Sequence, residues 1–259
     1  MALPCQDNDT RSNHSTPQME RKTMRFATVS FTALPLLLGS LALNPGPESA
    51  AIAGKVTFAG TPAKPKLIDM AKQPECIKLN PAGRLTEDVV TGPGNTLQNA
   101  LVYISGGDSD PGPSPAIAAT FDQRDCHYAT HVLPLRVGQD VSISNSDPFN
   151  HNIHPLGKIN REWNRVQLAG TPPFSYSYEN EEFIHVKCNI HAWMSAYFVV
   201  LKTRHVSVTK NDGSFRLPDL SPGRYTVTAW HELYGIQKQE VTVGGGETQT
   251  LNFVFHATP

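Results

Sequence analysis

The stretch "HVKCNIHAWMSAYFVV", residues 185–200, joins a group of metal-binding side chains to a run typical of a β-strand. Cys188, His191 and Met194 follow one another at intervals of three, and β-branched and aromatic residues come directly after them. A thiolate, an imidazole and a thioether in a loop at the start of a strand indicate a site for a soft metal ion. The competing interpretation is a buried structural thiol, with a methionine that only fills the core.

A second motif lies upstream in "VGQDVSISNSDPFNHNIHP", residues 137–155, where a strand ends in a loop that carries His151. One histidine from an earlier loop and a Cys-His-Met group from a later loop form the ligand set of a type 1 copper site. A thiolate and two imidazoles hold both Cu(II) and Cu(I), and the thioether is a weak axial ligand. His154 is an alternative to His151. The predicted ligands of one copper ion are His151, Cys188, His191 and Met194.

Zinc is the alternative metal, in a site that adds His185 to His151, Cys188 and His191. Structural zinc sites commonly use paired Cys or His motifs, whereas this group has a methionine in the fourth place. The sequence has no Gly-x-Ser-x-Gly elbow, phosphate loop or dinucleotide fingerprint. A copper ion with three strong ligands and a capped axial position leaves no open position for a substrate. We therefore predict electron transfer and not an enzyme.

Composition sets the broad class of the chain. Its 259 residues fit one large or two small domains, and 39 % hydrophobic residues suffice for real cores. Only 17 % are charged and the net charge is -1, so neither nucleic acid nor a strongly acidic surface is indicated as a partner. With 21 Pro, 19 Gly and few helix-period stripes, short strands joined by turns are expected. Residues 158–168 are a candidate for one short helix.

Residues 1–51 read as a polar extension followed by a secretory signal. Basic residues precede an apolar run at residues 31–43, and small residues follow it. Met24 is a better candidate start than Met1, because a signal normally begins close to its basic residues. The apolar run is short for a membrane span, so we expect cleavage near position 50 or 51, with an uncleaved anchor as the alternative. The predicted location is the periplasm, the cell envelope or the exterior.

An exported protein can form disulfides. Cys5 falls before the signal, which leaves three cysteines in the mature chain, an odd number. Because Cys188 has metal-type neighbours, we predict a Cys76–Cys126 disulfide and a Cys188 thiolate. The alternative is a disulfide that uses Cys188 and leaves a free thiol elsewhere.

The strand pattern divides the mature chain. Strands and turns are expected at residues 52–60, 97–107, 131–147 and 174–201. The pattern of residues changes from residue 205 onward. There, Asp-Gly and Pro-Gly pairs separate alternating strands. Two packed β-sandwiches fit this pattern best, so the predicted fold class is all-β.

The motifs also carry a resemblance. "VGQDVSISNSDPFNHNIH" is similar to the matching stretch of plastocyanin-like cupredoxins, and "CNIHAWM" has the Cys-His-Met spacing of the amicyanin and pseudoazurin branch. Residues 131–231 resemble exported cupredoxin-domain proteins labelled methylamine-utilisation-like. The resemblance implies a Greek-key β-sandwich, copper at the four ligands named above, and a redox partner protein in the envelope. It also implies that Asn152 ties the two ligand loops together and that His191 is the electron exit at the solvent edge.

The tail "VTKNDGSFRLPDLSPGRYTVTAW", residues 208–230, resembles the carboxypeptidase regulatory-like, transthyretin-type (prealbumin-like) sandwich. We therefore divide the chain into residues 1–51, a cupredoxin domain at 52–204 with an N-terminal strand region, and a regulatory-like domain at 205–259. Because that tail is short, an alternative completes it with residues 52–66 and inserts the cupredoxin between its halves. Some relatives of this module bind sugars, which implies an alternative function as a non-redox module with carbohydrate contact.

Overall fold

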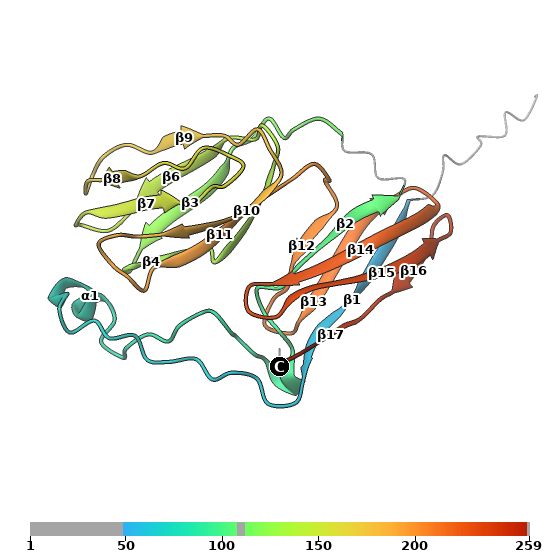
Figure 1. Cartoon of the computed structure of the whole chain (residues 1–259), viewed down its shortest axis with the longest axis horizontal. Coiled ribbons are helices and arrows are strands. Elements are labelled where there is room, and N and C mark those ends of the chain that lie inside the picture. The colour runs from blue at the N-terminus through green and yellow to red at the C-terminus, as the bar shows by residue number, and fades with distance from the viewer. Residues whose placement is uncertain (1–48, 108–111, 258–259) are drawn as a thin grey trace, which may run out of the picture. The chain divides into compact units, whose positions relative to one another are not determined.

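The computed structural model describes residues 49–107 and 112–257, which fold almost entirely into β-strands (Figure 1). The predicted all-β class is confirmed. The start proposed at Met24, most of the predicted signal, and Cys5 lie outside the described residues. None of the helices in the described residues has the length and apolar character needed to cross a membrane.

The first sandwich packs a five-stranded sheet, in the order β5-β11-β10-β7-β8, on a sheet in the order β4-β3-β6-β9. Its core draws Phe121 and Ile143 from one sheet and Ile184 and Phe198 from the other, all fully buried. It contains β3 (Ala119–Arg124), β4 (His127–Tyr128), β5 (Val132–Arg136), β6 (Val141–Asn145), β7 (His151–Pro155), β8 (Arg165–Gln167), β9 (Phe174–Tyr176), β10 (Glu182–Lys187) and β11 (Ser195–Leu201).

The second sandwich has one sheet in the order β12-β2-β14-β15, and a second sheet in which β1 pairs with β13, β16 and β17. Its separate core includes Ile52, Leu97, Val227 and Phe253. It contains β1 (Ala50–Ala59), β2 (Leu101–Gly107), β12 (Val206–Val208), β13 (Ser214–Leu220), β14 (Gly223–His231), β15 (Gly235–Val243), β16 (Thr248–Thr250) and β17 (Phe253–His256).

The two N-terminal strands lie in the second sandwich. β1 pairs with β13 and β17, and β2 pairs with β12 and β14, all of which follow the first sandwich in the chain. Both β1 and β2 contribute side chains to the second core. Strands β3–β11 thus lie between two parts of one sandwich. The exact domain boundaries stay a prediction.

Strand β11 is hydrophobic on both faces for a structural reason. Phe198 and Val200 enter the core of the first sandwich, whereas Val199 and Leu201 join a cluster with Trp230 of β14. Burial on both faces explains why the sequence after Met194 reads as a continuous apolar run and does not alternate.

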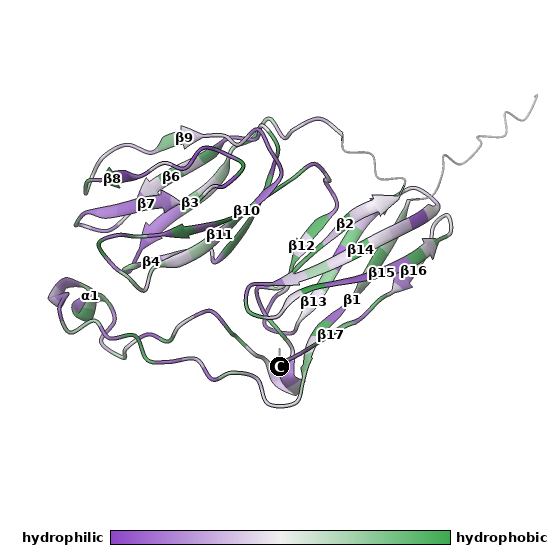
Figure 2. Cartoon of the chain, in the orientation of Figure 1, coloured by the Kyte–Doolittle hydropathy of each residue, from purple (hydrophilic) through white to green (hydrophobic). Residues whose placement is uncertain are grey.

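Strand β7 is polar in sequence and yet buried. Figure 2 colours this strand mainly as hydrophilic, yet His151, Asn152 and Ile153 are all buried. Polar side chains are buried only where partners satisfy them, so a buried polar strand marks a candidate site.

Residues 60–100, which we call the cap segment, connect β1 to β2. They contain α1 (Pro74–Leu79) and η1 (Pro93–Asn95). Pro74 opens α1, Glu75 lies in its first turn and Lys78 in its last, which suits the helix dipole. Apart from these helices, isolated bridges such as that between Leu67 and Leu85, and loop hydrogen bonds such as that from the Ile68 N–H to the Arg84 carbonyl, help to order this segment.

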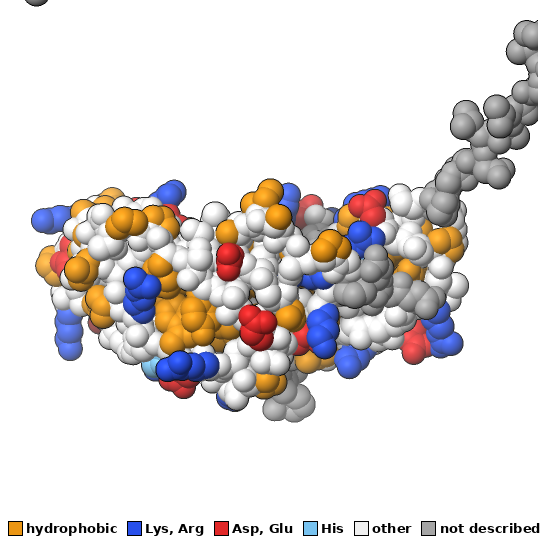
Figure 3. Space-filling model, turned by 90° about the horizontal axis from the view of Figure 1, so that it is seen from above, with side chains coloured by type: hydrophobic (Ala, Val, Ile, Leu, Met, Phe, Trp, Pro, Cys, Tyr) orange, Lys and Arg blue, Asp and Glu red, His pale blue; other side chains and the backbone are white. Residues whose placement is uncertain are grey.

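Charged side chains do not gather by sign on the face drawn in Figure 3. Lysine and arginine side chains lie interspersed with aspartate and glutamate. This distribution agrees with the net charge of -1.

Candidate metal centre

The loop between β10 and β11 places three of the predicted ligands. Lys187 pairs with Ser195, so residues 188–194 form the connection. Main-chain bonds close it, because the Cys188 N–H donates to Met194 O at 3.2 Å and the Met194 N–H donates to His191 O at 3.0 Å. The His191 N–H also donates to Cys188 Sγ at 3.4 Å. These bonds fix the loop before any ion binds.

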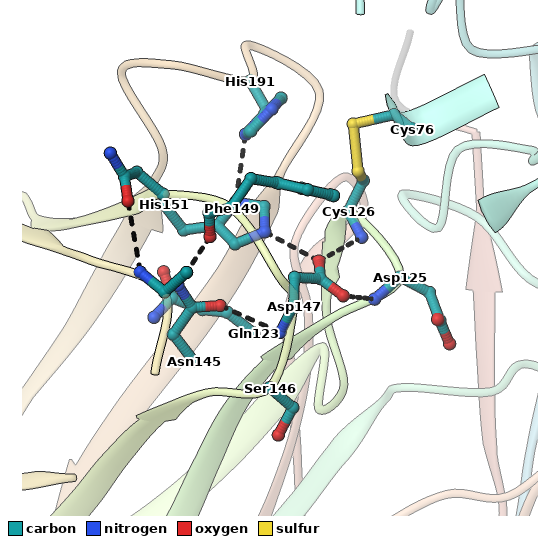
Figure 4. A network of polar contacts seen from close by, with 12 residues as sticks. Cys76, Gln123, Asp125, Cys126, Asn145, Ser146, Asp147, Phe149, His151 and His191 are labelled. Atoms are coloured by element: carbon teal, nitrogen blue, oxygen red, sulfur yellow. Dashed lines mark hydrogen bonds and ion pairs between the residues drawn. A yellow bond between two sulfur atoms is a disulfide. The ribbon is translucent and has the colours of Figure 1, made fainter. Parts of the chain in front are cut away.

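His151 reaches the same place from β7. This strand pairs with β10 so that His154 lies opposite Lys187, which places His151 beyond the end of β10 and beside the loop. His151 Nδ1 lies 3.0 Å from His191 Nδ1, and Cys188 Sγ lies 3.8 Å from His191 Nδ1. All three ligand atoms lie within 4.8 Å of one another (His151 and His191 are shown in Figure 4). Met194 is buried in the same cluster as Cys188.

The donor set fits a copper ion. His151, Cys188, His191 and Met194 are each at most 2 % exposed, so water is excluded. Burial raises the pKa of the Cys188 thiol, but hydrogen bonds with His151 and His191 and from backbone N–H groups outweigh it and lower the pKa to about 6. The thiolate, which is the metal-binding form, is therefore the main form at neutral pH. Two imidazole nitrogens and one soft thiolate form a set of ligands that suits copper.

Asp147 is a functional residue that the sequence reasoning missed. Asp147 is only 4 % exposed. Its Oδ2 accepts hydrogen bonds from His151 Nε2 at 2.7 Å and from the Cys126 N–H at 2.8 Å. Its Oδ1 accepts from the Asp125 N–H at 2.7 Å (Figure 4). Burial raises the pKa of Asp147, but these bonds, led by that of His151, lower it overall. An ionised Asp147 holds the proton of His151 on Nε2 and leaves Nδ1 free for a metal.

The signal for Asp147 was its position four residues before His151, in the same loop. The hydrogen bond with Asp147 also shifts the pKa of His151. Burial lowers the pKa of His151, but hydrogen bonds with Asp147 and Cys188 raise it overall. An acceptor in this position is the usual partner of a metal-bound histidine.

Asn152 connects the two ligand-bearing segments. Its Oδ1 accepts a hydrogen bond from the Asn189 N–H at 3.0 Å, next to Cys188. Its own carbonyl accepts a bond from the buried Tyr128 hydroxyl at 2.9 Å. The hydrogen bond between Asn152 and the Asn189 N–H is the kind of contact that the cupredoxin resemblance implies.

The alternative histidines point elsewhere. His154 Nδ1 lies 3.1 Å from Asn189 Oδ1 and its Nε2 lies 2.7 Å from Glu162 Oε1. His185 Nε2 lies 2.8 Å from Ser195 Oγ. In the described part of the chain, the His, Cys, Asp and Glu ligand atoms converge in two groups. These are His151–Cys188–His191 and Cys76–Cys126–His191.

His191 does not lie at the solvent edge, so that expectation is wrong. It is 1 % exposed, with the rings of Trp193 and Phe149 centred 5.3 Å and 6.2 Å from its own. The cap segment contributes to the burial of His191. Its Cys76 forms a disulfide with Cys126 against the His191 ring, as Figure 4 shows.

The disulfide belongs to a small apolar cluster that anchors the cap segment. Both cysteines are fully buried together with Met70, and Phe149 and Trp193 pack on them. Trp193 Nε1 donates to the Cys126 carbonyl at 2.9 Å, so Trp193 contacts both the disulfide loop and His191. Trp193 thus joins the ligand loop to the disulfide.

Residues 193–256 match the family model of the carboxypeptidase regulatory-like domain. The match runs from β11 to β17 and does not include β1 or β2, which pair with these strands. No curated protein sequence matches the chain.

Similar solved structures are cupredoxins. The purple cupredoxin of Nitrosopumilus maritimus has 21 % identity and a TM-score of 0.28, with 32 % of this chain and 99 % of that chain covered. A Cu(I) methionine-to-alanine variant of amicyanin has 18 % identity and a TM-score of 0.30, with 40 % and 99 % covered. The copper-containing nitrite reductase of Thermus scotoductus SA-01 has 17 % identity and a TM-score of 0.31, and 33 % of this chain spans 22 % of that enzyme.

Proposed function

We propose that this protein is a type 1 copper protein that transfers single electrons, with His151, Cys188, His191 and Met194 as ligands. The observation that carries the proposal is the convergence of two Nδ1 atoms on a buried cysteine whose pKa is lowered to about 6. A bound copper ion would supply the Cu(II)/Cu(I) couple at this place.

The protein's own residues would keep the ligands still. β7 and β10 are paired, the loop of residues 188–194 is closed by main-chain bonds, and Asp147 and Asn152 hold the segments from outside. Ligands that move little suit an ion whose charge changes, because the surrounding dipoles are already in place. Burial of all four side chains favours a carrier over an enzyme, which needs an open coordination position for its substrate.

The proposal includes an exported location with a redox partner protein in the envelope. The signal-like pattern of residues 1–51 supports it, as does the Cys76–Cys126 disulfide, since disulfides persist in oxidising compartments. Contact of the second sandwich with carbohydrate is the alternative role for that domain.

The test is the visible absorption and electron paramagnetic resonance spectrum of the full chain loaded with Cu(II). We expect an intense thiolate-to-copper band, absent in Cys188→Ala and kept in the control His154→Ala, whose ring contacts Asn189 and Glu162. A wild-type protein that stays colourless with Cu(II) refutes the proposal and leaves a zinc site or a non-redox binding module.

A further inference from the structure

We propose that Cys76 and Cys126, when reduced, form a second metal site with His191 that binds Cu(I). Their sulphur atoms and a ring nitrogen of His191 all lie within 4.8 Å of one another. All three residues are at most 1 % exposed, so the site is enclosed. In the disulfide state the sulphur atoms carry no thiolate charge, and the site exists only after reduction.

The chemistry of the three donors selects the ion. Two thiolates and one imidazole are a soft set, which suits Cu(I) and Zn(II). Structural zinc is almost always bound by four ligands. Across residues 49–107 and 112–257, no fourth His, Cys, Asp or Glu joins this group. Three donors therefore favour Cu(I), which accepts low coordination.

Hydrogen bonds as well as the disulfide hold both cysteines beside His191. Cys126 lies in the turn between β3 and β4, where Asp125 and Cys126 both have positive φ and both donate their N–H to Asp147. Cys76 lies on α1 of the cap segment, and Asn80 at the end of that helix donates its side-chain N–H to the Asp125 carbonyl at 3.0 Å. Opening the disulfide frees the side-chain torsions of both cysteines while these bonds keep α1 beside the turn, so both sulphur atoms can turn toward one ion.

The redox step balances with a dithiol as reductant. The dithiol gives two electrons and two protons to the Cys76–Cys126 bond, which yields two thiols here and one disulfide on the reductant. Binding of Cu(I) then releases the thiol protons. Because both sulphur atoms are buried, exchange needs local opening of the cap segment, or a chain in which the disulfide has not yet formed.

Closing the disulfide with a disulfide-bearing oxidant removes both thiolates and releases the ion. The released Cu(I) would then lie beside Cys188, whose Sγ is 3.8 Å from His191 Nδ1. This transfer rests on the proposed function of the neighbouring centre. The second site itself does not.

The test uses the full chain with Cys5→Ser and Cys188→Ala, which removes the other free thiols, in reduced and in oxidised form. Both forms are titrated with Cu(I) without oxygen against a chromophoric Cu(I) chelator. We expect the reduced form to retain one Cu(I) per chain that the oxidised form does not retain. X-ray absorption should show two sulphur neighbours and one nitrogen neighbour. Equal retention in both forms overturns the proposal.

Two further variants distinguish an enclosed site from a loose dithiol. Adding Cys76→Ser and Cys126→Ser should abolish the difference between the two forms. Adding His191→Ala should weaken retention in the reduced form, and unchanged retention there overturns the assignment of His191. Because Cys188 is absent from every arm, the colour of the type 1 centre plays no part. Failure of the proposed function therefore remains a separate result.

Discussion

Replacing Asp147 with asparagine tests whether this carboxylate prepares His151, a proposed metal ligand, for binding. Oδ2 of this carboxylate accepts bonds from His151 Nε2 and from the Cys126 N–H at once, which an NH₂ group in its place cannot do. If the amide turns its NH₂ toward His151, the imidazole accepts through Nε2 and carries its proton on Nδ1, where the metal should bind. Loss of such an outer partner typically lowers metal affinity about 10- to 100-fold, or about 1.4 to 2.7 kcal/mol.

The assay is a competition titration of Cu(II) with a chelator of known affinity, for wild-type protein and Asp147→Asn at neutral pH. The matched control is Glu182→Gln, because the Glu182 carboxylate also accepts backbone N–H groups, from Lys158, Ile159 and Asn160. We expect the control to bind copper like the wild type, even where its stability falls. Equal copper affinity in Asp147→Asn and the wild type would refute the idea that this carboxylate sets the tautomer of His151.

Two stability predictions concern other parts of the chain. Cys76→Ser with Cys126→Ser should lower the free energy of unfolding in urea by about 4 kcal/mol, since the bond closes a loop with a sequence separation of 50; a loss near zero contradicts this. His231 is buried, and burial, followed by the charge of His131, lowers its pKa to about 4. The unfolded chain takes up a proton near pH 6.5 that the folded chain does not, so stability should fall by about 2 kcal/mol from pH 7 to pH 5. In the His231→Gln variant, the free energy of unfolding should lose this part of its dependence on pH. An unchanged dependence on pH counts against the lowered pKa of His231.

The ligand pattern was readable from the sequence because it is local. The spacing of Cys188, His191 and Met194 lies in one short loop, and the strand on each side follows from its apolar residues. His151 required only the expectation that β7 and β10 are neighbours, and the structure shows this pairing. Which metal the group binds stays a prediction.

Asp147 and the burial of His191 could not be read in the same way. Asp147 gains its importance from contacts with two segments, and its position four residues before His151 does not reveal those contacts. The cap segment has no hydrophobic period, and its six-residue α1 is too short to produce one. The short helix expected at residues 158–168 is wrong for a related reason. That stretch holds β8 and turns, whose partners lie elsewhere in the chain.

The disulfide and the candidate metal centre are joined through two residues. His191 belongs to both groups of ligand atoms, and one oxygen of Asp147 accepts from both His151 and the Cys126 turn. That turn carries Cys126, so the carboxylate that orients His151 also holds one half of the disulfide. Trp193 adds a third link, because its indole is bonded to Cys126 and lies against His191. A cap that served only to shield the candidate ligands would need the apolar contacts of Met70 and Phe149 alone. The hydrogen bonds through Asp147 and Trp193 go further, because they join the candidate ligand segments to the turn that carries Cys126.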